Sequence, residues 1–200
     1  AYEIRPRDWS SDVCSSDLDD ASPMDDLVRQ ALAKWPNVPD CYGWLGLDAR
    51  GQWYMRDDRV QAAGPFAQHK GSVLRHDKLI GFIQRNYEPD SRGCWYFQNG
   101  PQRVYVELEA APLICRVADH GEVMAHTGHV VDVLGVWTDE IGHVFVQTRQ
   151  GLGLVHSQDV IHAAERIERG EWHVQTLQHE ALERQFGFCL SPQALQPLQP

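Results

Sequence analysis

Histidines concentrate in the second half of this chain, and imidazole is a common metal ligand and proton-transfer group near neutral pH. The tightest group is His126-Thr127-Gly128-His129, in which two imidazoles flank a turn glycine, with Asp132 nearby. Zinc sites use three or four side chains of these types that converge on one point. His126, His129 and Asp132 are therefore the candidate ligands of a metal site. Histidines exposed in turns are the alternative, since no H-E-x-x-H or paired-cysteine motif supports the site.

Aromatic residues form the second candidate site, because they concentrate in the first half of the chain. Exposed aromatic rings beside an arginine are typical of surfaces that bind peptides or small ligands. Alternation along a strand places Trp53 and Tyr54 on opposite faces, so one set of rings is expected to face solvent. Packing of all these rings in the core is the alternative interpretation. The candidate ligand-binding residues are Trp53, Tyr54, Tyr96, Arg103 and Tyr105.

Signals for other catalytic chemistry are weak. The chain has no G-x-S-x-G nucleophile motif. Glu107 and Glu109 fall on the same face of a predicted strand, about 7 Å apart by strand rise, which favours acid–base chemistry only inside a cleft. The sequence therefore predicts a non-enzymatic ligand-binding, protein-binding or regulatory module without a cofactor. A metal-dependent enzyme that uses histidines of the second half is the alternative.

Cysteines in the candidate native chain are not arranged as metal or redox motifs. None of them forms a C-x-x-C pair, and each adjoins apolar or aromatic residues. This pattern is typical of small buried hydrophobes, with disulfides or a catalytic thiol as the alternatives. Free thiols indicate a reducing compartment, so we expect a cytoplasmic protein. The four residues are Cys41, Cys94, Cys115 and Cys189.

Charge and hydropathy exclude two classes of partner. The formal net charge is −10, which argues against nucleic acid because phosphate contacts dominate such binding. No apolar run approaches the roughly 18 residues that a membrane span needs. The remaining partners are a small molecule or another protein.

The first residues resemble translated sequencing adapter. Asp8 to Leu18 matches the index-bearing adapter oligonucleotide residue for residue, and Ala1-Tyr2-Glu3 is read from its upstream part. Segments of this kind are excluded from fold reasoning. We expect residues 1–23 to be adapter and read-through sequence without structure, and Met24 to be the native start.

Hydrophobic periodicity and turn residues predict short helices alternating with strands. Helices are expected near residues 24–35, 76–87, 157–167 and 182–186. Strands are expected at 41–47, 52–55, 94–97, 103–108, 113–117, 130–137, 143–146, 152–155 and 172–174. The segment rich in Pro and Gln at residues 191–200 is expected to be a disordered tail.

Four segments share a turn glycine, a variable residue and a large apolar residue that opens a strand. They are Gly51-Gln52-Trp53, Gly93-Cys94-Trp95, Gly142-His143-Val144 and Gly170-Glu171-Trp172. A helix is expected between the two copies in each half, which predicts two related modules at residues 24–118 and 119–190. The fold class is α+β, each module having a hairpin, a helix and a strand, with the helix packed on an antiparallel sheet. Hairpins that simply reuse Gly and Trp are the alternative.

Residues 51–54, 79–86, 93–97 and 104–112 resemble an uncharacterised proteobacterial family whose members carry only a domain-of-unknown-function label. The arrangement is also similar to a second proteobacterial family of this kind, whose members have two β-rich repeated modules and a suggested signalling role. The resemblance covers residues 24–117 and is loose beyond residue 121. It implies tandem β-rich modules, and it carries no catalytic residues over to this chain.

Overall fold

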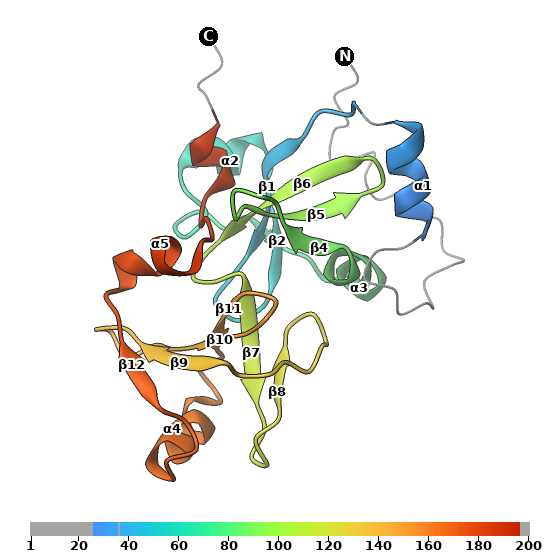
Figure 1. Cartoon of the computed structure of the whole chain (residues 1–200). Helices are drawn as coiled ribbons and strands as arrows, with labels where there is room; N and C mark the ends of the chain where they lie inside the picture. Colours follow the sequence, from blue (N-terminus) through green and yellow to red (C-terminus); the bar gives the residue numbers. More distant parts are fainter. Residues whose placement is uncertain (1–25, 36, 197–200) are drawn as a thin grey trace.

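The computed structural model describes residues 26–35 and 37–196, and within them the chain forms two six-stranded mixed sheets with helices (Figure 1). The predicted α+β class with two β-rich modules is therefore confirmed. The expected adapter segment at residues 1–23 and the last four residues of the expected tail lie outside the described residues. No helix of the described part is long and apolar enough to cross a membrane.

The first sheet has the strand order β3-β2-β1-β6-β5-β4. Its strands are β1 (Cys41–Leu47), β2 (Trp53–Met55), β3 (Ser72–Val73), β4 (Tyr87–Pro89), β5 (Trp95–Asn99) and β6 (Gln102–Leu108). The expected strands of this region pair as two hairpins, because β1 pairs antiparallel with β2, and β5 pairs antiparallel with β6. The central pair, β1 and β6, is parallel, and this pairing joins the two hairpins into one sheet.

The second sheet has the order β12-β9-β10-β11-β7-β8. Its strands are β7 (Leu113–Val117), β8 (Val123–Ala125), β9 (Gly135–Thr138), β10 (Val144–Gln147), β11 (Leu152–Val155) and β12 (Val174–Thr176). The prediction placed residues 113–117 in the first module, but β7 pairs with β11 and β8. The chain therefore passes from the first sheet to the second at residues 109–112, between β6 and β7.

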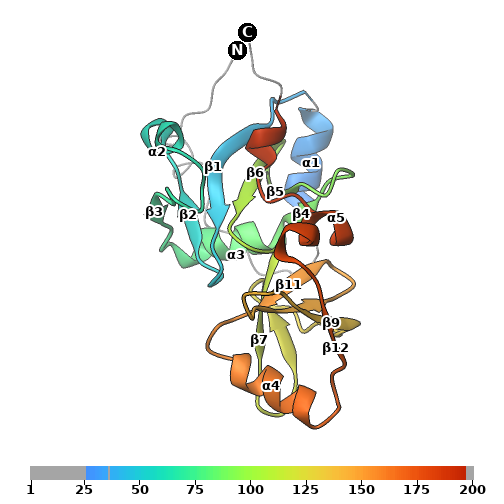
Figure 2. The ribbon, with the colours of Figure 1, turned by 90° about the vertical axis from the view of Figure 1, so that its left-hand side faces the viewer.

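Five α-helices accompany the sheets within the described residues. They are α1 (Asp26–Lys34), α2 (Asp58–Ala63), α3 (Asp77–Arg85), α4 (Val160–Glu168) and α5 (Leu182–Phe186). His76 directly precedes helix α3, and its Nδ1 accepts a hydrogen bond from the Leu79 amide and so caps the helix. Its apolar residues recur at helical spacing, so Leu79 and Ile83 are buried on one side of the helix. Figure 2 shows α3 on the side of the first sheet that faces the second sheet, and α4 at the far end of the second sheet.

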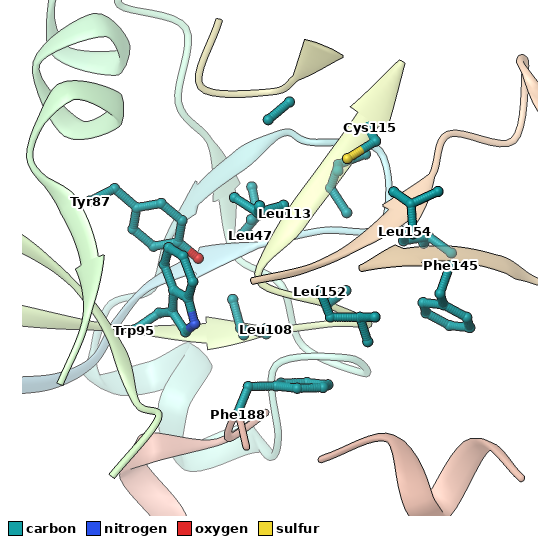
Figure 3. Packing of buried hydrophobic residues seen from close by; sticks show 14 of the residues in the cluster. Leu47, Tyr87, Trp95, Leu108, Leu113, Cys115, Phe145, Leu152, Leu154 and Phe188 are labelled. Atoms are coloured by element: carbon teal, nitrogen blue, oxygen red, sulfur yellow. The ribbon is translucent and has the colours of Figure 1, made fainter. Parts of the chain in front are cut away.

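One hydrophobic core runs through both sheets. Figure 3 shows side chains of the two sheets packed together, and Phe188 from the C-terminal part of the chain lies in the same cluster. Complete burial of one such side chain contributes roughly 1.5–3 kcal/mol, so this shared core holds the two sheets together. Its members include Leu47, Trp95, Leu108, Leu113, Phe145 and Leu152.

The last part of the chain returns from the second sheet to the first. We call residues 177–196 the C-terminal arm. It contains the 3-10 helices η1 (His179–Ala181) and η2 (Pro192–Leu195), with α5 between them. The Ser191 hydroxyl donates to Glu107 Oε2 at 2.5 Å, and the Gln193 amide donates to Glu107 Oε1 at 3.0 Å. The prediction of a disordered tail from residue 191 is therefore wrong for residues 191–196, because Glu107 provides acceptors that the local sequence does not reveal.

Two further predictions require correction. The strand expected over residues 130–137 begins only at Gly135, preceded by an isolated bridge at Val130. The fourth copy of the turn-glycine pattern, at Gly170, is not a hairpin turn, because its amide donates to Ile167 O at the end of α4. The repeat therefore holds for three hairpins, those that turn at Gly51, Gly93 and Gly142.

Candidate metal centre in the second sheet

Within the part of the chain that the structure describes, three hairpin turns are built around an aspartate. In each turn, one carboxylate oxygen accepts the backbone amides two and four residues further on, and the fourth residue of the turn is a glycine with positive φ. A positive φ strains residues that carry a Cβ, so the glycine is required at this position. The aspartates are Asp48, Asp90 and Asp139, and the glycines are Gly51, Gly93 and Gly142.

The second carboxylate oxygen has different partners in the three turns. Asp48 Oδ2 accepts from the Tyr54 hydroxyl at 3.3 Å, and Asp90 Oδ2 accepts from Arg92 Nε at 2.9 Å and the Tyr105 hydroxyl at 3.0 Å. Asp139 Oδ2 instead contacts two imidazoles. His143 Nδ1 lies 2.7 Å from it and His179 Nδ1 lies 2.9 Å from it. The second carboxylate oxygen thus faces a phenol at Asp48, and a guanidinium and a phenol at Asp90. At Asp139 it faces two imidazoles, which are potential metal ligands.

The two histidines come from parts of the chain that are distant in sequence. His143 follows the turn directly and leads into β10, whereas His179 begins η1 in the C-terminal arm. The His179 amide donates to Glu140 Oε2 at 2.8 Å, which fixes the start of the arm against the turn. The imidazole rings lie 6.0 Å apart, and the Phe145 ring lies 6.2 Å from His143 and 6.4 Å from His179. The rings are thus positioned by a backbone hydrogen bond and by a buried aromatic ring.

The electrostatics of the cluster favour a cation. The Asp139 side chain has no exposed surface, whereas His143 and His179 keep 46% and 33% of theirs. Burial on its own raises the pKa of Asp139, but the hydrogen bonds from His143, His179 and the turn amide outweigh it and lower this pKa to about 2. Asp139 is therefore an ionised carboxylate at neutral pH, and both imidazoles reach solvent beside it.

The donor set fits a divalent transition metal. Among the described residues, Asp139, His143 and His179 form the group whose ligand atoms all lie within 4.8 Å of one another. Two imidazoles and one carboxylate are ligands that Zn²⁺ accepts, at about 2.0–2.2 Å. Three protein ligands leave room for water or another ligand. The two turn amides on Asp139 Oδ1 supply the outer hydrogen bonds that orient a ligating carboxylate.

The residues predicted as metal ligands do not come together in this way. His126 points into the protein, where its Nδ1 accepts from the Ile114 amide at 3.2 Å and its Nε2 has no hydrogen-bond partner among the described residues. The His126 ring lies 5.6 Å from Trp53 and 5.8 Å from Tyr87, and burial lowers its pKa to about 3. His129 and Asp132 are exposed. The metal site expected at His126, His129 and Asp132 is therefore not formed, because the first ligand is used in the core.

The predicted aromatic set is divided between the core and a second cluster. Trp53 is 1% exposed and packs edge-on against Tyr87 in the main core. Tyr54 is half-buried and packs against Phe66. Tyr96 and Tyr105 are directly opposite each other on β5 and β6, both buried, and the exposed Arg103 lies over the Tyr96 ring at 4.7 Å. The structure therefore brings together Tyr96, Arg103 and Tyr105, and it separates Trp53 from them.

The sequence contained one local signal for the observed centre. Asp139 and His143 are four residues apart across a turn glycine, a spacing that places both residues on one hairpin. His179 carries no such signal, because 36 positions separate it from His143 and only the return of the C-terminal arm places it on Asp139.

Comparisons with known proteins place the chain in a family. It belongs to the DUF2944 family, whose description reads "Protein of unknown function (DUF2946)" and which matches residues 24–193. The expected membership of a domain-of-unknown-function family is thereby confirmed. No curated protein matches this chain.

Two solved structures are similar to this chain, both described as DUF1285 family proteins. The protein from Silicibacter pomeroyi DSS-3 has 13% sequence identity and a TM-score of 0.44, over 64% of this chain and 72% of that chain. The protein from Shewanella baltica OS155 has 15% identity and a TM-score of 0.43, over 61% of this chain and 91% of that chain.

Proposed function

We propose that this protein is a divalent-metal-binding module, in which Asp139, His143 and His179 hold a zinc-class ion at the start of the C-terminal arm. The carrying observation is the convergence of two imidazole Nδ1 atoms, at 2.7 Å and 2.9 Å, on one oxygen of a buried carboxylate. The proposal keeps the predicted role of a non-enzymatic binding or regulatory module, and it names a metal ion as the ligand. A cytoplasmic location belongs to the same proposal, supported by the free cysteines of the described residues.

The consequence of binding follows from where the ligands lie. Asp139 and His143 belong to the β9–β10 hairpin, and His179 belongs to the arm that later docks on Glu107 of the first sheet. An ion that binds all three fastens the arm to the second sheet. Because the ion binds the folded arrangement and not the unfolded chain, it stabilises the protein, and this stabilisation grows with the logarithm of the ion concentration above the dissociation constant. We therefore infer that the metal regulates how firmly the C-terminal arm is held.

Titration calorimetry with ZnCl₂ on the full chain, first freed of metal, tests this proposal. One ion per chain is expected for the native sequence. The variants His143→Ala and His179→Ala should each weaken binding by more than 100-fold, because each loses one of three ligands. His129→Ala is the matched control, because its imidazole is exposed on a comparable turn, and it should bind as the native chain does. Equal binding by all four proteins, or no binding by the native chain, contradicts the proposal.

A further inference from the structure

Two cysteines meet where the C-terminal arm crosses the first sheet. Cys94 directly precedes strand β5 and is 0% exposed, and Cys189 lies in the arm and is 9% exposed. The Cys189 amide donates to the carbonyl of Gly93 at 3.1 Å, so the two backbones run against each other at this point. The two cysteines belong to one small buried cluster, together with Tyr96 and Tyr105. Both thiols are free.

The contact between these backbones is closer than ordinary packing. A Cβ built on Gly93 would lie 2.0 Å from the carbonyl oxygen of Gly187, so only glycine permits the arm to approach the turn this closely. Disulfides need Cα atoms about 4.4–6.8 Å apart with the Cβ atoms facing each other. The backbone hydrogen bond between Cys189 and Gly93, next to Cys94, and the burial of both cysteines in one cluster are compatible with that range.

We propose that Cys94 and Cys189 form a reversible disulfide that locks the C-terminal arm onto the first sheet. The oxidant is a peroxide. One thiolate sulfur attacks a peroxide oxygen and becomes a sulfenic acid, while the other oxygen leaves as water after it takes up a proton. The second thiol then attacks that sulfur, and the sulfenic oxygen leaves as water. Two thiols and one hydrogen peroxide thus give one disulfide and two waters, and a dithiol reductant reverses the step.

Burial controls the rate of this reaction. Removal from solvent raises the pKa of Cys189 to about 12 and also raises that of Cys94, so little thiolate is present while the arm is docked. Oxidation of a thiol therefore requires transient opening of the arm. When the arm docks again, the disulfide forms and prevents further opening. Because the bond closes a loop of more than 90 residues, it restricts the unfolded chain strongly. This proposal rests on other residues than the metal centre, whose ligand in the arm is His179.

The test uses the full chain with Cys14, the fifth cysteine of the sequence and part of the adapter-like segment, replaced by serine (Cys14→Ser), and with a chelator present so that no metal occupies the thiols. Hydrogen peroxide treatment, followed by alkylation and mass spectrometry without reduction, should show the loss of two hydrogens and a peptide pair joined through Cys94 and Cys189. The melting temperature should rise by several degrees and return after treatment with a dithiol. Cys41→Ala is the matched control, because its partly buried thiol is not part of the pair, and it should behave identically.

The proposal has a clear contrary result. Cys94→Ala and Cys189→Ala should each lose both the joined peptides and the peroxide-induced rise in melting temperature. Oxidation of either cysteine to a sulfinic acid without a cross-link overturns the proposal. So does a cross-link to Cys41 or Cys115, or two unmodified thiols after treatment at a temperature where the arm opens.

Discussion

The turn at residues 125–128 and the turn at residues 139–142 have the same backbone hydrogen bonds. In the first, the Ala125 amide donates to His129 O and the Gly128 amide donates to Ala125 O, both at 2.9 Å. In the second, the Asp139 amide donates to His143 O and the Gly142 amide donates to Asp139 O, both at 3.2 Å. Each turn is therefore followed by a histidine at the equivalent position.

The chemistry of the two turns differs because of one residue and one distant partner. The first position is a buried alanine in one turn and a buried, ionised aspartate in the other. Only the second turn receives another histidine, His179, from the C-terminal arm. His126, inside the first turn, is directed into the core instead. A histidine beside a turn glycine thus becomes a candidate metal ligand only when a carboxylate is placed to orient it and the fold supplies a further ligand.

The two turns are expected to differ most in how their histidines affect the free energy of unfolding at acid pH. The pKa of His126 is lowered by burial from 6.5 to about 3, so the unfolded chain binds the proton more tightly than the folded chain. The stability that depends on neutral His126 is therefore complete above pH 6.5 and is lost as the pH falls toward 3. One proton of difference corresponds to about 1.4 kcal/mol of unfolding free energy per pH unit within that window.

Urea unfolding at a series of pH values between 7 and 4 measures this effect. His126→Asn keeps an acceptor for the Ile114 amide but cannot be protonated in this range, so its stability should fall less steeply by about 1.4 kcal/mol per unit. His129→Asn removes the exposed histidine of the same turn and should follow the native profile. Parallel profiles for the native chain and His126→Asn would contradict the assignment of His126 to the core.

The elements of the fold were largely predictable, because local patterns carry them. The Asn99-Gly100 hairpin, the amphipathic helix α3 and the alternating strand β6 all lie where periodicity and turn residues predicted them. Short elements such as α2 and β4 were missed, because their few residues carry little periodicity. The placement of β7 in the second sheet was also missed, since the sequence shows that a segment is extended but not which strand it pairs with.

The candidate site depended almost entirely on tertiary contacts. The prediction favoured the residues closest together in sequence, His126 and His129, and burial of His126 against Trp53 and Tyr87 removed the first of them. The observed set needed His179, which reaches Asp139 only because the arm continues from β12 back toward the first sheet. The spacing of Asp139 and His143 was the one local signal, and two residues alone do not define a metal site.

The second prediction concerns the carboxylate that distinguishes the turns. Asp139→Asn keeps an oxygen for the two turn amides but removes the negative charge and the oxygen that faces both imidazoles. Zinc affinity in calorimetry should fall by more than 100-fold, or at least 2.7 kcal/mol. Asp90→Asn is the matched control, because it makes the same change in an equivalent turn whose free oxygen contacts Arg92 and Tyr105. Equal losses of zinc affinity in Asp139→Asn and Asp90→Asn would show that the measured affinity depends on the stability of the turns and not on the Asp139 carboxylate as a metal ligand.

The smallest effects are expected from replacing the turn glycines, which distinguishes backbone strain in the turns from metal binding by their side chains. Gly128 and Gly142 have φ values of 85° and 96°, and a Cβ at either position would meet no atom within 4 Å. Alanine at either site therefore costs only the strain of positive φ, about 1–2 kcal/mol of unfolding free energy, which urea unfolding measures. The two stability losses should be similar.

Gly142→Ala should also weaken zinc binding several-fold, because its turn fixes Asp139 relative to His143, whereas Gly128→Ala should leave the affinity unchanged. A loss of affinity in Gly128→Ala that matches the loss in Gly142→Ala would mean that general destabilisation, and not the geometry of the Asp139 turn, governs metal binding.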